Sequence, residues 1–385
     1  MDDTPFRVEI PETDVRDLKA RLRAVRLADD FANADWRFGV ERGWLKDMLA
    51  YWADDYDWRA EETAINRLPH HRTEIDGVPI HYVHAKGKGP APLPIILTHG
   101  WPWTFWDWRD LIGPLSDPAA YGGSANDAFD VIVPSLPGFG FSAPLRKTDI
   151  GVRDIAALWV RLMGGLGHDR FMAGGGDWGS LVTAELGHAH PRRVAGVHLT
   201  LPMLPGVNRG TVRPSDFDAS EHWMRERNRE AQAVSDGHIL AHRRSAQTLA
   251  YAFEDSPAGL AAWIWERRRN WSDCNGDVER VFGRDFLCTT ASLYWFTRTI
   301  GTSMRLYAAH GPERWAPLHD RERVIDVPTA FAVAPRELFL MPRQIAERKT
   351  NLVRWSVLPE GGHFLPSETP QQLVDEYRAF GKILR

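Results

Sequence analysis

The sequence predicts an α/β fold in which helices cover both faces of a mostly parallel sheet. Short continuous apolar runs alternate with helix-like segments in the middle of the 385-residue chain, a pattern typical of parallel strands that are buried on both sides. A long helical stretch interrupts this pattern, and strand-like runs resume near the C-terminus. We therefore expect a helical cap inserted over the carboxyl edge of one sheet, where ligands bind in open α/β folds.

The chain begins with a segment, residues 1–75, that is expected to be mainly helical. Pro11 and Glu12 are suited to open the first helix, since proline is tolerated in the first turn. Apolar residues at helical spacing mark its buried face: Val15, Leu18, Leu22 and Leu27. The stretch HRTEIDGVPIHYVHAKG then predicts a hairpin around Asp76-Gly77.

Three further divisions follow from the same pattern. Residues 76–202 are expected to form the first part of the core, 203–320 the helical cap, and 321–385 the second part of the core. With the hairpin, six strands precede the cap, so that the cap is inserted after the sixth strand. The remaining strand-like runs of the core lie at 94–100, 129–138, 169–176, 194–201, 327–335 and 353–362.

Composition excludes several classes of partner. The formal net charge is −4, with 47 basic and 51 acidic residues, so neither nucleic acid nor a membrane is expected as a partner. No run approaches the ~18 apolar residues of a spanning helix, and no signal peptide is visible. Cys274 and Cys288 are too few for a disulfide framework and lack the neighbours of a metal site. We therefore expect a cytoplasmic protein without a metal.

The stretch AGGGDWGS at 173–180 is the main chemical signal. Gly175 and Gly179 flank Asp177 in the pattern of a nucleophile elbow, with aspartate in place of serine. The glycines suit a sharp, crowded turn. Asp177 could instead cap the helix that follows. As a nucleophile it would be ionised at pH 7, so that it could displace a leaving group from a saturated carbon and form an alkyl ester without a base.

A second motif, LTHGWPWTF at 97–105, supplies groups for a developing negative charge. The backbone N–H of Trp101, together with that of Trp178, could form an oxyanion hole. His99 is expected to be structural, because the loop backbone can satisfy a buried imidazole there.

The histidine and the acid of the site are expected after the last two strands. His363 in EGGHFLPSETP and Glu337 in APREL follow the chain order nucleophile, acid, histidine. Glu337 would orient the imidazole and stabilise its charged form, although it could also be a solvated residue at a helix start. Glu368 and Asp326 are weaker candidates for the acid.

At this point the chain resembles epoxide hydrolases of the microsomal type and their soluble bacterial relatives, over nearly its whole length. The resemblance implies an α/β-hydrolase fold, an N-terminal segment that packs toward the cap, and hydrolysis of a small-molecule epoxide to a vicinal diol without a cofactor. The motifs that carry it are, in order, HGWP, PSLPGFGFS, GGDWGS, TLAYAFEDSPAGLAAWI, LYWFTRTIGTSMRLY, APREL and GGHF.

The resemblance also implies roles for single residues. Asp177 is the nucleophile, His363 the base that activates water, and Glu337 its partner. Tyr307 falls where the family has one of two tyrosines that protonate the epoxide oxygen. His238 stands where the other tyrosine is usual.

The cap wall therefore departs from the family pattern. A histidine donates or withholds a proton according to pH, with an ordinary pKa near 6.5, so His238 could act in a pH-dependent way. It could also only fill space, with Tyr307 acting alone or with Tyr251. His242 likewise replaces a glutamine of the family.

Two other functions and the identity of the substrate stay open. Haloalkane and haloacid dehalogenases use the same Asp–His chemistry, and a catalytically silent relative could bind a small molecule. We expect Trp103, Trp295 and Phe139 to line a pocket for an aryl or bulky epoxide, while aromatic residues of the cap such as Trp263, Trp265, Trp295 and Phe296 could equally form its core. Roles in detoxification and in secondary metabolism are both compatible with the resemblance, as is a homodimer.

Overall fold

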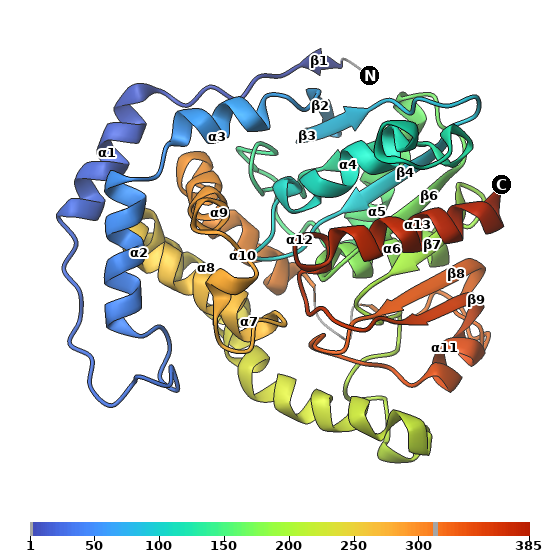
Figure 1. The fold of residues 1–385 in the computed structure, drawn as a ribbon. Coiled ribbons are helices and arrows are strands. Elements are labelled where there is room, and N and C mark those ends of the chain that lie inside the picture. The colour runs from blue at the N-terminus through green and yellow to red at the C-terminus, as the bar shows by residue number, and fades with distance from the viewer. Residues whose placement is uncertain (1–2, 311–314) are drawn as a thin grey trace.

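A nine-stranded sheet forms the centre of the protein, as seen in a computed structural model that describes residues 3–310 and 315–385 (Figure 1). The strand order is β1-β2-β3-β5-β4-β6-β7-β8-β9. The pairs from β5 through β4 to β9 are parallel, whereas β1, β2 and β3 join the edge in antiparallel register. The strands are β1 (Thr4–Pro5), β2 (His70–Ile75), β3 (Val78–Ala85), β4 (Leu93–Thr98), β5 (Phe129–Pro134), β6 (Phe171–Gly175), β7 (Val194–Leu199), β8 (Ile325–Val333) and β9 (Thr350–Val357).

Helices cover both faces of this sheet, and β7 shows how. A Cβ on Gly196 would lie 2.7 Å from Phe380 in α13 (Pro370–Leu384), whereas one on Gly187 in α6 (Trp178–Ala189) would meet Val197 at 3.0 Å. Gly196 and Val197 are successive residues of one strand and therefore face opposite sides. The sheet is thus buried between α13 and α6, which explains its continuous apolar strands.

Two more helices complete these layers. α4 (Arg109–Ser116) packs beside α13, and α5 (Val152–Gly165) packs beside α6. Short helices α11 (Arg343–Lys349) and α12 (Leu365–Glu368) lie in the C-terminal part of the core.

The cap lies between β7 and β8, and its described residues include the α-helices α7 (His222–Asp255), α8 (Pro257–Trp271), α9 (Arg284–Thr297) and α10 (Ile300–Ala309). α7 is kinked at Ser245, whose φ of −138° departs from helical geometry. α8 begins at a proline, and the hydroxyl of Ser256 accepts a hydrogen bond from the Gly259 N–H, as expected of a helix N-cap.

The N-terminal segment runs along the cap (Figure 1). Its helices are α1 (Glu12–Arg23), α2 (Arg42–Asp54) and α3 (Trp58–Ile65). Buried side chains of this segment bond to α9: the Trp52 indole donates to Ser292 at 2.9 Å, and the Tyr56 hydroxyl lies 2.9 Å from that of Thr289. The segment is therefore joined to the cap by specific polar contacts as well as by packing.

The predicted fold class is confirmed. The hairpin, the buried strands, the inserted cap and the C-terminal helix are all present. One detail differs, because the two-residue strand β1 pairs with β2 and makes the cap follow the seventh strand instead of the sixth. So short a strand carries no apolar pattern of its own, and only its pairing defines it.

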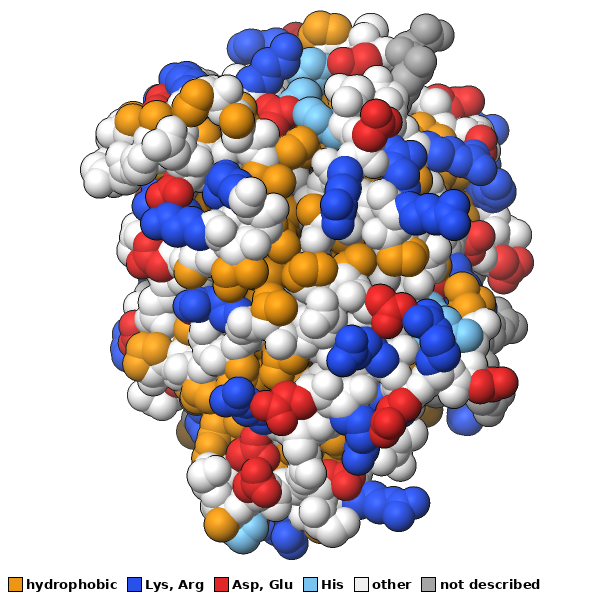
Figure 2. Space-filling model, turned by 90° about the vertical axis from the view of Figure 1, so that its right-hand side faces the viewer, with side chains coloured by type: hydrophobic (Ala, Val, Ile, Leu, Met, Phe, Trp, Pro, Cys, Tyr) orange, Lys and Arg blue, Asp and Glu red, His pale blue; other side chains and the backbone are white. Residues whose placement is uncertain are grey.

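Two features of the described residues bear on the partners considered from composition: the charges on one face and the apolarity of the helices. On the face shown in Figure 2, acidic and basic side chains are interspersed among apolar ones and do not form a field of one sign. Within the described ranges, we find no helix that combines the length and the apolarity needed to cross a bilayer.

Candidate active site

Asp177 occupies a sharp turn between β6 and α6. Its backbone has φ 51° and ψ −125°, a conformation that costs a non-glycine residue about 1–3 kcal/mol. The turn is crowded, since a Cβ on Gly179 would lie 1.8 Å from the Thr98 carbonyl oxygen and one on Gly175 would lie 2.4 Å from the Gly179 backbone. Both glycines are therefore required by close approach of the backbone. The turn presents the Asp177 side chain at the carboxyl edge of the sheet.

The two carboxylate oxygens of Asp177 have different partners. Oδ1 accepts a hydrogen bond of 2.7 Å from the Trp101 backbone N–H, while Oδ2 lies 3.4 Å from Nε2 of His363. Trp178 is the first residue of α6, so its N–H is one of those that have no partner within the helix. The side chain of Asp177 is 17% exposed, which leaves it open to a ligand in the adjacent cavity.

His363 and Glu337 form a buried pair behind this carboxylate. Nδ1 of His363 lies 2.6 Å from Oε1 of Glu337, and neither side chain is exposed. The same Oε1 accepts a 2.6 Å hydrogen bond from the Leu338 N–H. Burial lowers the pKa of His363, but the charge of Glu337 and the hydrogen bonds to Asp177 and Glu337 outweigh it and raise this pKa to about 10. The imidazole between two carboxylates is therefore held as a cation at rest.

Glu368 binds the backbone around His363 and does not pair with the imidazole, which is paired with Glu337. Its carboxylate accepts hydrogen bonds from the backbone N–H groups on both sides of His363: Gly362 at 2.9 Å and Phe364 at 2.7 Å. A third comes from Asp273 at 2.7 Å. Burial raises the pKa of Glu368 to about 7. Glu368 thus fixes the loop that carries His363, whereas the other candidate, Asp326, pairs with Arg321 on the surface.

Tyr307 and His238 come from α10 and α7 and meet above Asp177. The Tyr307 hydroxyl is buried and makes no well-directed hydrogen bond within the described residues. Burial followed by the Asp177 charge raises its pKa well above the ordinary value, although the nearby Trp178 side chain acts in the opposite direction. The His238 ring lies 5.3 Å from that of Tyr307 and stacks on Trp101. Its Nδ1 likewise makes no well-directed hydrogen bond within the described residues.

The protonation of His238 differs from the expectation of a switch near pH 6.5. Burial lowers the pKa of His238 well below its ordinary value, and the charges of His242 and Arg267 act in the same direction. The ring is therefore neutral at pH 7 and can donate only through the single N–H of a neutral imidazole.

His242, one turn further along α7, is a neutral imidazole as well. The Trp263 indole donates to its Nε2 at 3.1 Å, so the proton of the ring resides on Nδ1. Burial lowers the pKa of His242 to about 3. Tyr251, the other suggested donor, is 72% exposed and lies on the surface.

A cavity of about 270 Å³ separates the elbow from the cap. Asp177, His363, Tyr307 and His238 line it, and its surface is mostly apolar. The aromatic side chains among its lining residues are Trp178, Trp271, Tyr307, Trp315 and Phe339. An aromatic pocket is therefore present, but most of its members are different from those that the sequence suggested.

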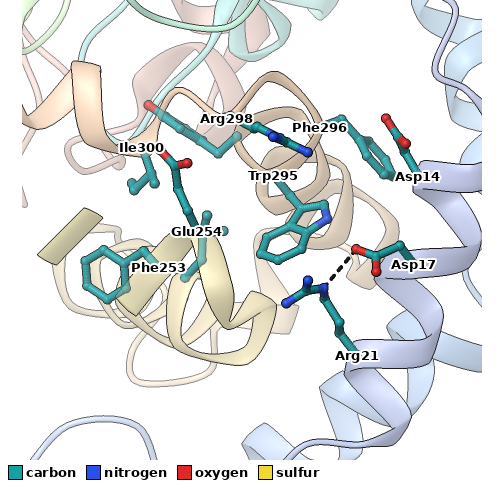
Figure 3. A pocket seen from close by; sticks show the side chains of 11 residues that line it. Asp14, Asp17, Arg21, Phe253, Glu254, Trp295, Phe296, Arg298 and Ile300 are labelled. Carbon is teal, nitrogen blue, oxygen red and sulfur yellow. Dashed lines mark hydrogen bonds and ion pairs between the residues drawn. The ribbon is translucent and has the colours of Figure 1, made fainter. Parts of the chain in front are cut away.

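The three predicted pocket residues Trp103, Trp295 and Phe139 are not among those that line this cavity. Trp103 is fully buried behind His363, with ring centroids 5.6 Å apart, and Phe139 packs on His99. Trp295 lines another cavity, of about 360 Å³, next to Phe296 and near Asp17 and Arg21 of α1 (Figure 3). The outward side of α9 faces the N-terminal segment, and this accounts for the position of Trp295.

Trp271, Leu338 and Phe339 are the main lining residues that the sequence analysis missed. Leu338 and Phe339 directly follow Glu337, so their position in the chain was an available signal. Trp271 ends α8, and its carbonyl oxygen accepts a 2.9 Å hydrogen bond from the His363 N–H. No signal in the sequence connects these two residues.

His99 has the structural role that was expected. Its Nε2 accepts a 3.0 Å hydrogen bond from the Leu136 N–H, so its Nδ1 donates to the Gly100 carbonyl oxygen at 2.9 Å. Burial lowers the pKa of His99 to about 4. The ring thus ties the loop that carries Trp101 to the end of β5.

Comparison with known proteins agrees with this geometry. Residues 3–108 match the family model described as epoxide hydrolase N terminus, and residues 94–370 match that of the alpha/beta hydrolase fold. A protein of Stigmatella aurantiaca named "Putative epoxide hydrolase" is 38% identical over 99% of this chain and 85% of its own length. Epoxide hydrolase 1 of Oryctolagus cuniculus is 32% identical over 98% of this chain and 88% of its own length.

Solved structures give the same result. The epoxide hydrolase of Aspergillus niger superposes with a TM-score of 0.88 at 28% identity, covering all of this chain and 97% of the other. The juvenile hormone epoxide hydrolase of Bombyx mori has a TM-score of 0.88 at 27% identity, covering all of this chain and 95% of the other. With the elbow aspartate, the buried Glu–His pair and the cap tyrosine already described, these matches show that the chain belongs to the epoxide hydrolase family of the α/β-hydrolase fold.

Proposed function

We propose that the protein hydrolyses an aryl or otherwise bulky epoxide to a vicinal diol through an ester on Asp177. The observation that carries this proposal is the Asp177 carboxylate itself. It stands on a strained turn, it is held by the Trp101 N–H at 2.7 Å, and it faces a mostly apolar cavity. Water is scarce in such a cavity, which favours attack by an ionised and poorly solvated carboxylate.

In the first step, an Asp177 oxygen attacks an epoxide carbon and the C–O bond of the ring breaks. The oxygen that leaves takes a proton from the Tyr307 hydroxyl, which makes no well-directed hydrogen bond of its own within the described residues. The neutral imidazole of His238 supports the same oxygen with its N–H. Two donors on one developing alkoxide stabilise the transition state in a site of low dielectric.

Formation of the ester removes the Asp177 charge that holds His363 as a cation, so the imidazolium releases its proton, and the Tyr307 phenolate regains a proton through solvent. In the second step, the neutral imidazole of His363 takes a proton from water, and the resulting hydroxide attacks the carbonyl carbon of the ester. The imidazolium is stabilised by Glu337 at 2.6 Å. The Trp101 and Trp178 N–H groups receive the tetrahedral oxyanion. Collapse of this intermediate releases the diol and restores the Asp177 carboxylate.

Dehalogenation is a second candidate function, favoured by one observation. The indole Nε1 of Trp178 is buried and makes no well-directed hydrogen bond to any described residue, and Trp178 lines the cavity. An indole N–H is a donor only, and it suits a halide leaving group. Styrene oxide and a matched alkyl halide separate the two functions, because the first yields diol and the second yields free halide. Turnover of neither would favour a binding protein instead.

The covalent scheme is tested by a single turnover in water labelled with heavy oxygen. We expect the label to enter the Asp177 carboxylate and not the first diol. One oxygen of that diol comes from the aspartate, and the other comes from the epoxide. Label in the first diol would show direct attack by water and refute the ester.

A trapping variant gives an independent test. His363→Gln should accumulate the alkyl ester, detected as a gain in the mass of the intact protein equal to one substrate. His190→Gln is the matched control, since His190 lies outside the residues that line the cavity. A His363→Gln variant that binds substrate without any adduct would contradict the role of His363.

We also propose that the protein resides in the cytoplasm. Cys274 and Cys288 are buried free thiols, a state that a reducing compartment preserves.

A further inference from the structure

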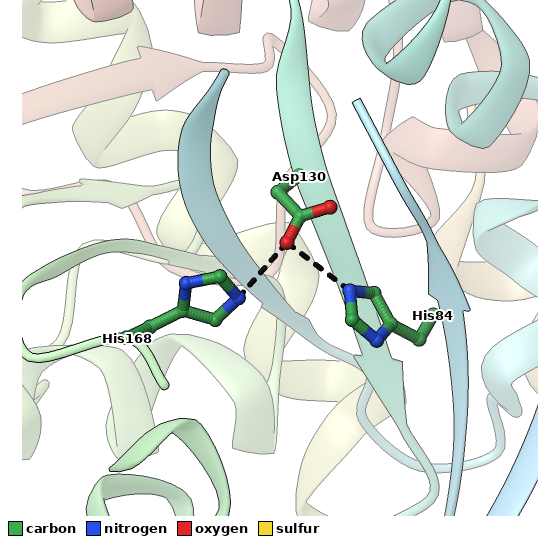
Figure 4. Close-up of side chains that lie close together, drawn as sticks. All are labelled: His84, Asp130 and His168. Atoms are coloured by element: carbon green, nitrogen blue, oxygen red, sulfur yellow. Dashed lines mark hydrogen bonds and ion pairs between the residues drawn. The ribbon is translucent and has the colours of Figure 1, made fainter. Parts of the chain in front are cut away.

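Two histidines and an aspartate converge at the end of the sheet away from the active site (Figure 4). Nε2 of His84 lies 3.1 Å, and Nε2 of His168 2.9 Å, from the same oxygen of Asp130, Oδ2. His84 belongs to β3, Asp130 to β5, and His168 to the turn between α5 and β6. Their side chains are 10%, 14% and 17% exposed, respectively. None of the three has a place in the mechanism proposed above.

The donor set is one that first-row divalent metals prefer. Two imidazole nitrogens and one carboxylate oxygen are common ligands of zinc, which leaves a fourth position for water. The three ligand atoms lie within 4.8 Å of one another. Around a tetrahedral zinc with bonds near 2.1 Å, ligand atoms lie roughly 3.4 Å apart. Small rotations of partly exposed side chains are enough to reach that spacing.

The hydrogen bonds of the group also suit a metal. Nε2 of His168 is buried, and although it is close to Asp130 it makes no well-directed hydrogen bond. The other carboxylate oxygen of Asp130, Oδ1, accepts a 3.1 Å hydrogen bond from the Gly87 N–H, which orients the carboxylate from behind. Such outer contacts fix metal ligands in place.

We propose that His84, Asp130 and His168 form a zinc-binding site that is separate from the catalytic centre. The site joins two neighbouring strands and the turn before β6. Asp130 is the second residue of β5, whereas the catalytic groups lie past the opposite, carboxyl ends of the strands. Bound zinc would therefore stabilise the fold and would leave the chemistry at Asp177 unaffected.

The test uses full-length protein without a histidine tag, treated with a chelator and then titrated with zinc chloride in a calorimeter. We expect one zinc per chain and a rise of a few degrees in Tm on saturation, because a ligand that binds only the folded state stabilises it. His84→Ala and His168→Ala should each lose this binding. His190→Ala, which removes a histidine outside the group, should retain it.

Asp130→Asn tests the site with little effect on folding, since it keeps the shape of the side chain and removes only its charge. It should weaken zinc binding at least tenfold while the epoxide turnover of the variant stays that of the parent. Cobalt in place of zinc should give the visible absorption of a four-coordinate N,O site. Failure of the parent protein to bind zinc, or binding that survives in both histidine variants, would overturn the proposal.

Discussion

Replacing Asp177 by asparagine should lower the pKa of His363 strongly. The imidazole lies between two carboxylates, with Asp177 Oδ2 at 3.4 Å and Glu337 Oε1 at 2.6 Å. Asp177→Asn removes the negative charge on the Nε2 side and changes the shape of the site little. The variant therefore isolates how much of the raised pKa depends on the nucleophile.

The size of the effect follows from the distance. Two unit charges 3.4 Å apart interact by about 5 kcal/mol at an effective dielectric constant of 20. Since one pKa unit corresponds to about 1.4 kcal/mol, the expected drop is roughly 3 to 4 units. The pKa of His363 should fall from about 10 toward neutrality.

The consequence for catalysis is direct. Formation of the proposed ester on Asp177 would remove the same charge that Asp177→Asn removes. His363 would thus be a cation while the nucleophile is free and would become able to release its proton once the ester has formed. The base is then available only in the step that needs it.

Nuclear magnetic resonance of protein labelled in its histidine rings measures this pKa. Comparison with the spectrum of His363→Gln assigns the resonance, and titration from pH 5 to 11 gives the value in the parent and in Asp177→Asn. Asp326→Asn is the matched control, because Asp326 pairs with Arg321 on the surface. A shift of less than one unit in Asp177→Asn, or an equal shift in the control, would refute the electrostatic reasoning.

Three further outcomes are expected. The raised pKa of His363 contributes stability that is fully present below the unfolded-state pKa near 6.5 and is lost as pH rises toward 10. Urea unfolding of the parent at a series of pH values should show this loss of unfolding free energy. The Asp177→Asn variant should show a smaller loss. Glu368→Gln leaves at least one buried N–H around His363 unsatisfied, so it should cost about 1–3 kcal/mol of unfolding free energy and lower kcat; Gln371→Glu, on the surface, is the control. His238→Phe should slow ring opening without changing the pH profile of this step between pH 6 and 8, because the pKa of His238 lies well below its ordinary value. Stopped-flow fluorescence of the active-site tryptophans can follow ring opening. A change in the pH profile would contradict a neutral His238 ring.

The convergence of three side chains of the candidate active site could be predicted from the sequence because it depends on local features. Asp177, Glu337 and His363 each follow a recognisable strand, and the carboxyl ends of parallel strands meet at one edge of the sheet. The glycines around Asp177 gave a further local signal. The order of the parallel strands thus largely decides where these three side chains meet.

The lining of the cavity could not be predicted in this way. The direction of a side chain on a cap helix depends on how that helix is rotated, and the rotation is decided by contacts with distant parts of the chain. Trp295 shows this, because α9 turns it toward α1 and away from Asp177. Trp271 shows the converse, since its place beside His363 depends on a backbone hydrogen bond across 92 positions. The sequence analysis named Glu368 only as a weaker candidate for the acid, because its hydrogen bond to Asp273 joins distant parts of the chain. The His84–Asp130–His168 group was missed because its members come together only through the pairing of strands.

The attachment of the N-terminal segment to α9 has a consequence for how the protein is made. Trp52 and its partner Ser292 are 240 positions apart in the chain. Tyr56 and Thr289 are 233 positions apart. At roughly 5–20 residues per second, a ribosome needs on the order of 10–50 s to synthesise the chain between them. During that time the aromatic side chains of α2 and α3 have no cap to pack against, and their exposed surface is open to chaperones. These helices therefore leave the ribosome well before the cap that buries them has been made.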